Sequence, residues 1–412
     1  MTYIYKNASY IIGLIIWLVY FILVYQFSSS APFMDDYDLY LKSLINLKEA
    51  NGFQEKLITL FAQHNEHRPF IPRIIALVDL KINGWLNLKI LIIIGNIALF
   101  LTWLKLIQHL PIKEPMYKWL VSTGIIFIIT GLQSTENIFW ATGALQNYLT
   151  ILSIVCSLSS LSKGNYWWGV IYFIFAISCS ITGFILAPFI IIPIFIKKKF
   201  IKASCITVVI SIIVFAYFYS YHPIQHSTKN HYTGFIPTIK YFFAFIGSSF
   251  SFYGINLPLA YLGGVSVFIL SAYIIIKTKR RDFWWMICVF ILVSAFIAVY
   301  SRSNLGVLQA LSSRYRIFSE LIFISLVAMF IINYSKYKKA LSLGFFCLGL
   351  IFLVTQIYVL KPVVENNKKM LDTGMIVFVR IKNPAYLMYP APPVAAERLI
   401  RAYEKHIYKP DL

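Results

Sequence analysis

Long apolar runs separated by short polar segments extend along most of the chain. A helix needs about 17 to 25 mostly apolar residues to cross a bilayer, and about eleven runs reach or approach that length. These runs are Tyr10–Phe27, Leu88–Ile107, Trp119–Leu132, Phe139–Leu161, Trp167–Ile181, Gly183–Ile196, Ile201–Tyr221, Leu257–Ile276, Phe283–Tyr300, Ile317–Ile332 and Ala340–Leu360. The pattern predicts an all-α, polytopic transmembrane protein.

Several apolar segments leave alternatives open. The short runs Trp167–Ile181 and Gly183–Ile196 are either two crossings or one broken or tilted pair. A further apolar run, Tyr241–Asn256, is interpreted as interfacial or re-entrant. The first run is interpreted as a retained anchor and not as a cleaved signal peptide, because it exceeds the roughly 7 to 15 apolar residues of a signal core.

Charge adds an orientation to this pattern. The chain of 412 residues is 59% hydrophobic and only 13% charged, with a net charge of +21. Lys and Arg recur in every second loop, as in "KKKFIK" and "KTKRRD", and basic residues in short loops stay on the cytoplasmic side. We therefore predict a multi-pass protein of the cytoplasmic membrane with its N-terminus inside. The basic clusters are divided among loops, which argues against a nucleic-acid partner.

The first outer loop, about residues 28–87, is the longest segment between predicted spans and opens with an acidic pair. Leucines recur at helical spacing from Leu39 to Leu47 and predict an amphipathic helix on the membrane surface. A second interfacial helix is expected at about Ile71–Ile82. Residues 1–360 would form the membrane domain, and residues 361–412 a short tail on the outer face.

The acidic pair, Asp35 and Asp36, has two interpretations. One of the two carboxylates can cap a helix, but two adjacent carboxylates repel each other unless a cation or a proton compensates. In the same loop, Glu66, His67 and Arg68 stand in a row before a proline. These three residues form either a local salt bridge or part of a binding site.

This arrangement resembles the GT-C superfamily of integral membrane glycosyltransferases. The resemblance is carried by a long N-terminal span, "MDDY" at the start of a large first outer loop, helices in that loop and many further spans. It implies transfer of a sugar from a polyprenyl-phosphate-linked donor to a glycan or lipid acceptor in the cell envelope. Asp35 and Asp36 would then act as general base or metal ligand. Whether a divalent metal such as Mg²⁺ or Mn²⁺ is required stays open.

Such a reaction expels a phosphate, so fixed cations are expected at the outer face. The late outer segment "SRSNLGVLQALSSRYRIFSE" supplies Arg302, Arg314 and Arg316, and Tyr315 lies between two of them. Arg suits phosphate because its planar guanidinium makes two-point contacts. The alternative is that Arg316 pairs with Glu320 one helical turn later.

Two other functional classes remain. An O-antigen polymerase or ligase also uses lipid-linked sugars, but typically relies on arginines in late outer loops without an acidic pair in the first loop. A transporter or flippase for lipid-linked sugars would place ionisable residues in the middle of the membrane, where Glu320 is the single acid that falls inside a predicted span. The five cysteines lie in apolar spans and predict neither a disulfide framework nor a metal site.

Overall fold

The computed structural model describes residues 2–222, 234–251, 256–278 and 282–410, and for residues 2–10 it gives the helical backbone alone. The chain is 82% helical, and its described residues contain no strand. Within the described ranges, eight helical segments are long and apolar enough to cross a membrane, which confirms a polytopic helical membrane protein. They are Leu88–Gln108, Pro115–Phe139, Ala141–Ser162, Phe200–Phe218, Leu257–Lys277, Phe283–Leu305, Ser313–Asn333 and Ser335–Ile381.

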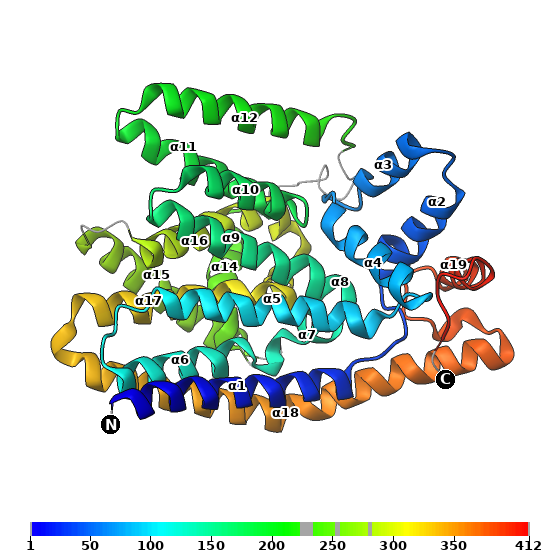
Figure 1. Ribbon diagram of the computed structural model, residues 1–412. Helices are drawn as coiled ribbons and strands as arrows, with labels where there is room; N and C mark the ends of the chain where they lie inside the picture. The colour runs from blue at the N-terminus through cyan, green and yellow to red at the C-terminus, as the bar shows by residue number, and fades with distance from the viewer. Residues whose placement is uncertain (1, 223–233, 252–255, 279–281, 411–412) are drawn as a thin grey trace.

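These segments correspond to labelled helices of Figure 1. They contain α5 (Leu88–Gln108), α6 (Pro115–Ile129) with α7 (Thr135–Phe139), α8 (Ala141–Gly143) with α9 (Leu149–Ser162), α12 (Phe200–Phe218), α15 (Leu257–Lys277), α16 (Phe283–Arg302), α17 (Arg316–Asn333) and α18 (Lys338–Ile381). The remaining apolar helices are α1 (Thr2–Phe27), α10 (Tyr166–Ile177), α11 (Leu186–Ile196) and α14 (Phe235–Ile246).

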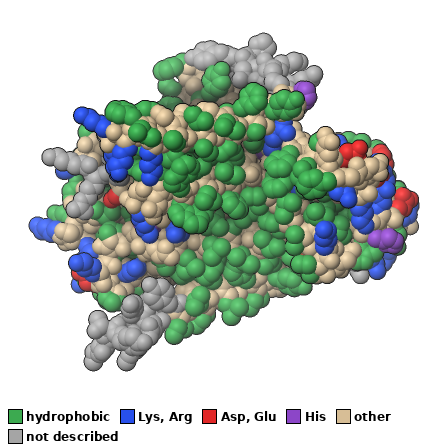
Figure 2. All heavy atoms as spheres, turned by 45° about the horizontal axis from the view of Figure 1, so that its top comes forward, with side chains coloured by type: hydrophobic (Ala, Val, Ile, Leu, Met, Phe, Trp, Pro, Cys, Tyr) green, Lys and Arg blue, Asp and Glu red, His purple; other side chains and the backbone are tan. Residues whose placement is uncertain are grey.

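The helices run roughly parallel to one long direction, so their turns gather at two ends. In Figure 1 the N-terminus and the turns α5–α6, α11–α12 and α17–α18 lie at the left end, while the helices of the first outer loop lie at the right end. Figure 2 shows a broad apolar face between an end rich in Lys and Arg and an end where both charges mix. Apolar side chains on the candidate spans, such as Phe215 (74% exposed) and Ile276 (85%), have the exposure expected of lipid contacts.

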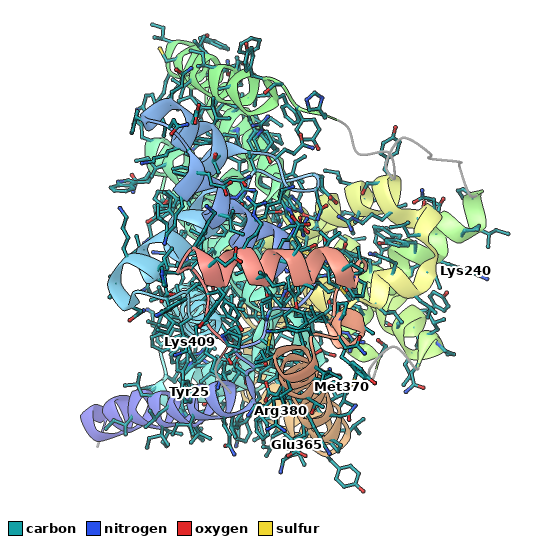
Figure 3. All side chains as sticks on the ribbon, turned by 90° about the vertical axis from the view of Figure 1, so that its right-hand side faces the viewer. Tyr25, Lys240, Glu365, Met370, Arg380 and Lys409 are labelled. Atoms are coloured by element: carbon teal, nitrogen blue, oxygen red, sulfur yellow. The ribbon has the colours of Figure 1, made fainter. Side chains whose placement is uncertain are left out.

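Helix α18 extends beyond Leu360, the residue at which the last predicted span ends. The whole helix is 44 residues long, about 66 Å at 1.5 Å per residue. This length is about twice the hydrocarbon thickness of a bilayer. The apolar run ends at Lys361 and Pro362, and the helix passes through both residues into a stretch, "ENNKKMLD", that is rich in polar and charged side chains. Figure 3 shows Glu365, Met370 and Arg380 arranged around this projecting part.

The first outer loop also differs from its prediction. Its leucine-rich helix is a π-helical turn, Tyr37–Lys42, followed by α2 (Ser43–Glu49). Leu39, Leu41 and Leu44 are at most 1% exposed, so the apolar face is buried in protein and does not lie on the lipid surface. The reason lies in the C-terminal segment, whose helix α19 (Pro392–Glu404) crosses this end of the molecule and covers the loop (Figure 3).

Two further helices complete the loop. These are α3 (Phe53–Phe61) and α4 (Phe70–Asn83), the second of which matches the predicted helix at Ile71–Ile82. At the end of α4, the Asp79 carboxylate accepts a hydrogen bond from the Asn87 backbone N–H at 2.7 Å. The Asn87 side chain in turn caps α5 by accepting from the N–H groups of Lys89 and Ile90. The loop is therefore fixed directly to the start of a span.

Candidate functional site

Asp36 points into the protein and fixes the acidic segment to a span. Its carboxylate accepts hydrogen bonds from the Phe33 N–H (3.1 Å), the Thr142 N–H (3.0 Å) and the Thr142 hydroxyl (2.7 Å). Because Thr142 lies in the first turn of the helix that starts at Ala141, Asp36 acts as an N-cap supplied from another segment. Asp36 is 2% exposed, and burial raises its pKa to about 7 in spite of these hydrogen bonds.

The start of that helix packs closely against its surroundings. A Cβ on Gly143 would clash with the Glu136 carbonyl, and a Cβ on Gly95 would lie 2.5 Å from the Ala144 backbone carbon. The Trp140 indole N–H also donates to the Phe33 carbonyl at 2.9 Å. Residues 33–36 therefore rest on a rigid part of the bundle.

The C-terminal segment holds the same residues from the other side. The Met34 N–H donates to the Met388 carbonyl at 3.0 Å. Asp38 forms an ion pair with Arg398 at 2.9 Å and accepts a hydrogen bond from the Tyr389 hydroxyl at 2.6 Å. Of the acidic pair, Asp36 is thus buried, and Asp35 is the member that stays partly exposed.

Asp35 is ionised and partly exposed. One of its oxygens lies 3.8 Å from Nε2 of His64, and 31% of its side chain is accessible. Burial alone would raise the pKa of Asp35, but the nearby His64 imidazole and the Arg314 guanidinium hold it below its usual value. Asp36 therefore keeps its proton to a higher pH than Asp35, which lessens the repulsion between the two neighbours.

His64 is presented by a tight turn formed by residues 64–67. The backbones of His64 and His67 exchange two hydrogen bonds of 2.8 and 2.9 Å, and Asn65 takes the left-handed conformation (φ 51°) that Asn tolerates well. Nδ1 of His67 accepts the Ile181 N–H at 3.2 Å, which ties the turn to the end of the α10–α11 pair. Burial lowers the pKa of His67 to about 4, so its ring is neutral.

Two arginines from the late outer segment complete the site. Arg302 forms an ion pair with Glu66 and stacks over the Tyr315 ring, with 5.6 Å between the guanidinium carbon and the ring centre. Arg314 pairs with Glu136 at 3.2 Å. Its guanidinium carbon lies 5.7 Å from the centre of the Trp140 ring.

We call these residues the mouth cluster. It consists of Asp35, His64, Glu66, Glu136, Arg302 and Arg314, with the rings of Trp140 and Tyr315. The ionisable side chains of the cluster are 11 to 38% exposed, so all of them are within reach of a solute. Within the described part of the chain, the terminal nitrogens of Arg314 have no hydrogen-bond partner, which leaves them available to an anion.

Arg316 and Glu320 lie elsewhere, enclosed in the bundle. The Gln133 side chain joins them: its amide donates to Glu320 at 2.8 Å, and its carbonyl accepts from Arg316 at 3.1 Å. Arg316 also donates to the Ser251 carbonyl at 2.8 Å. We call Gln133, Arg316, Glu320 and Gln356, whose carbonyl accepts the Gln133 N–H at 3.0 Å, the buried network. Arg316 is 2% exposed and Glu320 0%, so neither faces the mouth cluster's open side.

Arg68 has a connecting position. Its guanidinium donates to the carbonyls of Phe61 and Tyr219, both at 2.8 Å, and thereby joins the first outer loop to the end of α12. Sequence reasoning singled out Arg68 but missed His64 and Glu136. The available signal for Glu136 was its position between two expected spans, and for His64 it was its place two residues before the row Glu66–Arg68.

No group of three His, Cys, Asp or Glu side chains in the described residues is arranged to hold a metal ion. Comparisons with protein-family models, with curated proteins and with solved structures give no match to this chain. The functional argument therefore rests on the mouth cluster itself.

Proposed function

We propose that this chain is a GT-C-type glycosyltransferase of the cytoplasmic membrane, with about eleven spans and its N-terminus inside. It would transfer a sugar from a polyprenyl-phosphate-linked donor to a glycan or lipid acceptor at the outer face. The observation that carries the proposal is an ionised, accessible Asp35 beside two partly exposed arginines at the ends of apolar helices.

Asp35 suits the role of general base. An acceptor hydroxyl must lose its proton as its oxygen attacks the anomeric carbon, and a carboxylate within hydrogen-bond reach accepts that proton. The lowered pKa of Asp35 keeps its carboxylate in the ionised form, which a general base requires, near neutral pH. Asp36 contributes differently, because its oxygens are occupied by Thr142 and Phe33 and serve to position the segment.

Arg302 and Arg314 suit the leaving group. As the bond between the sugar and the carrier phosphate breaks, negative charge grows on a phosphate oxygen, and fixed guanidinium groups stabilise it. Glu66 and Glu136 hold the two arginines in place, and the rings of Tyr315 and Trp140 support their flat faces. If the reaction uses Mg²⁺ or Mn²⁺, Asp35 would hold the ion, which would supply positive charge to the leaving phosphate, and loss of transfer on adding a chelator tests this requirement.

One observation favours transport as a second candidate. Glu320 is buried within a candidate span, and its Oε2 atom has no hydrogen-bond partner in the described residues. Buried acids in spans commonly mark transport pathways. Under this alternative Glu320, and not Asp35, would be the residue on which function depends.

Structural analysis of cell-surface glycans with and without this protein tests the proposal. Loss of one side-branch sugar, with chain length unchanged, is the expected result. Loss of chain length would instead identify a polymerase. Accumulation of the complete lipid-linked sugar on the inner leaflet would identify a flippase.

A further inference from the structure

A polar recess lies where the end of α1 meets the projecting part of α18, and it shares no residue with the mouth cluster. Its volume is about 330 Å³, and it is lined by Gln26 and Phe27 of α1 and by five polar side chains of α18. In Figure 1, α1 ends beside the middle of α18. Phe27 is the last residue of the first apolar run, so the recess lies at the level where apolar surface gives way to polar surface.

The two acids of the recess are already engaged within the protein. Glu365 pairs with Lys361, one turn earlier on α18, at 3.7 Å. Asp372 accepts a hydrogen bond from the Ser29 hydroxyl at 2.6 Å, which ties α18 to the segment after α1. These contacts leave little carboxylate charge for the remaining cations of the recess.

Those cations are Lys368 and Lys369, which also line the recess. Within the described parts of the chain, neither side chain makes a hydrogen bond or an ion pair, and the same holds for the Gln26 amide and the Thr373 hydroxyl beside them. Ammonium, amide and hydroxyl groups all donate hydrogen bonds, and ammonium groups bind phosphate oxygens well. The recess therefore offers unused donors and surplus positive charge to a phosphate group.

Apolar surface continues from the recess towards the bilayer core. One helical turn before Gln26, Ile22 and Leu23 are exposed on the same side of α1. Two turns before Glu365, Tyr358 is exposed on the corresponding side of α18. A free phosphate ion would leave these apolar surfaces without a partner, whereas the acyl chains of a phospholipid would cover them.

We propose that this recess binds the headgroup of an anionic phospholipid. Lys368 and Lys369 hold the phosphate, and Gln26 and Thr373 donate to the remaining headgroup oxygens. An anionic headgroup such as phosphoglycerol fits better than a zwitterionic one, because the unused charge of the recess is positive. The bound lipid fastens α1 to the projecting part of α18. This inference does not depend on the proposed glycosyl transfer.

The first experiment measures the reactivity of single lysines. The full-length protein in detergent is acetylated briefly, with and without dioctanoyl phosphatidylglycerol, and each lysine is quantified by mass spectrometry after proteolysis. Lys382, exposed at the end of the same helix, is the matched control. We expect the lipid to protect Lys368 and Lys369 and to leave Lys382 unchanged. No protection, or equal protection of all three lysines, would overturn the proposal.

Two further probes separate the possible ligands. Glycerol phosphate carries the headgroup without acyl chains, and dioctanoyl phosphatidylcholine carries the chains with a zwitterionic headgroup. We expect neither to protect Lys368 and Lys369 at the concentration at which phosphatidylglycerol does. Protection by glycerol phosphate would identify a site for free phosphate, and equal protection by phosphatidylcholine would remove the preference for an anionic lipid. Either result rejects the proposal.

The second experiment measures Tm in phosphatidylcholine nanodiscs with an increasing fraction of phosphatidylglycerol. A lipid that binds the folded protein raises its Tm. Each lysine near an anionic headgroup contributes about a fivefold factor to affinity, so Lys368→Gln/Lys369→Gln should lose most of this rise. Lys81→Gln/Lys382→Gln, which removes the same charge from exposed positions, should keep it.

A variant that retains both charges makes the result independent of folding defects. Lys368→Arg/Lys369→Arg should keep the rise in Tm, because guanidinium groups also bind phosphate. Loss of the rise in this variant would reject the proposal, as would an equal loss in the recess variant and in Lys81→Gln/Lys382→Gln.

Discussion

The mouth cluster and the buried network are built from the same kinds of side chain but differ in access. Both draw on the segment before α17, which supplies Arg314 to the mouth cluster and Arg316 to the buried network. Arg314 keeps about a third of its side chain exposed, whereas Arg316 is enclosed and bonded to protein carbonyls. Arg314 can therefore contact a ligand, whereas Arg316, two residues later in the chain, holds helices together.

The acidic pair repeats this contrast between immediate neighbours. Both carboxylate oxygens of Asp36 accept hydrogen bonds, and its pKa is raised. Asp35 is accessible, and its pKa is lowered. Burial favours the neutral form of a carboxyl group, and nearby positive charges favour the ionised form. Position, and not residue type, thus separates the candidate base from its support.

The largest expected effect comes from opening the buried network. Gln133→Leu leaves Glu320 and Arg316 without the side chain that joins them. Breaking one side of a buried charged network costs about 3 kcal/mol or more, so we expect a lower Tm and little folded protein. Size-exclusion chromatography and thermal unfolding in detergent measure both, with Glu365→Gln on the exposed part of α18 as the control. A Gln133→Leu protein as stable as that control would remove the network from the framework.

The next effect concerns the phosphate contact of the mouth cluster. Arg314→Lys keeps the positive charge but loses the planar two-point contact, so the donor KM should rise about tenfold, equal to about 1.4 kcal/mol. Arg401→Lys, in an exposed pair with Glu49, is the matched control. Unchanged donor dependence in both Arg314→Lys and Arg302→Lys would remove the phosphate from this site.

A smaller effect separates the acidic pair by pH. The pKa of Asp36 is about 7 in the folded protein and 3.8 for the free side chain. Between these two pH values the folded state binds more protons than the unfolded state. Raising the pH through this window therefore removes stability. The Tm of wild type minus that of Asp36→Asn should be larger at pH 5 than at pH 7.5, by thermal unfolding in detergent. The opposite trend would mean that Asp36 is ionised in the fold.

The smallest effect is expected in the C-terminal segment. Arg398→Lys keeps a cation near Asp38 and weakens a partly exposed ion pair, a change of about 0.2 to 1 kcal/mol. Turnover should stay within about twofold of wild type, measured as sugar transfer in vesicles. A tenfold loss would show that α19 does more than support the loop.

The sequence predicted the helical membrane architecture because long apolar runs have few other solutions in a bilayer. Its failures occur where apolarity stops being informative. Helix α18 continues past Leu360 through a stretch that contains charged residues. The leucine face of residues 39–47 is covered by a C-terminal segment more than 300 residues away in the chain.

Part of the candidate site could also be predicted from the sequence. Asp35, Arg302 and Arg314 stood out as charged residues near expected span ends, and Glu66 as part of a charged row in the first outer loop. The structure brings them together. The separation of Asp35 from Asp36, and of Arg314 from Arg316, depends on which neighbour buries each side chain. That information lies in tertiary contacts such as the one between Asp36 and Thr142, which no local pattern encodes.

The most direct measurement compares uncharged replacements in the two regions. The rate of sugar transfer per folded molecule is measured in vesicles for Asp35→Asn and for Glu320→Gln. We expect Asp35→Asn to lose roughly 100-fold or more, the scale of general acid–base catalysis, and Glu320→Gln to keep most of the wild-type rate. Near-normal transfer in Asp35→Asn together with loss of function in Glu320→Gln would contradict this account and place the function in the buried network.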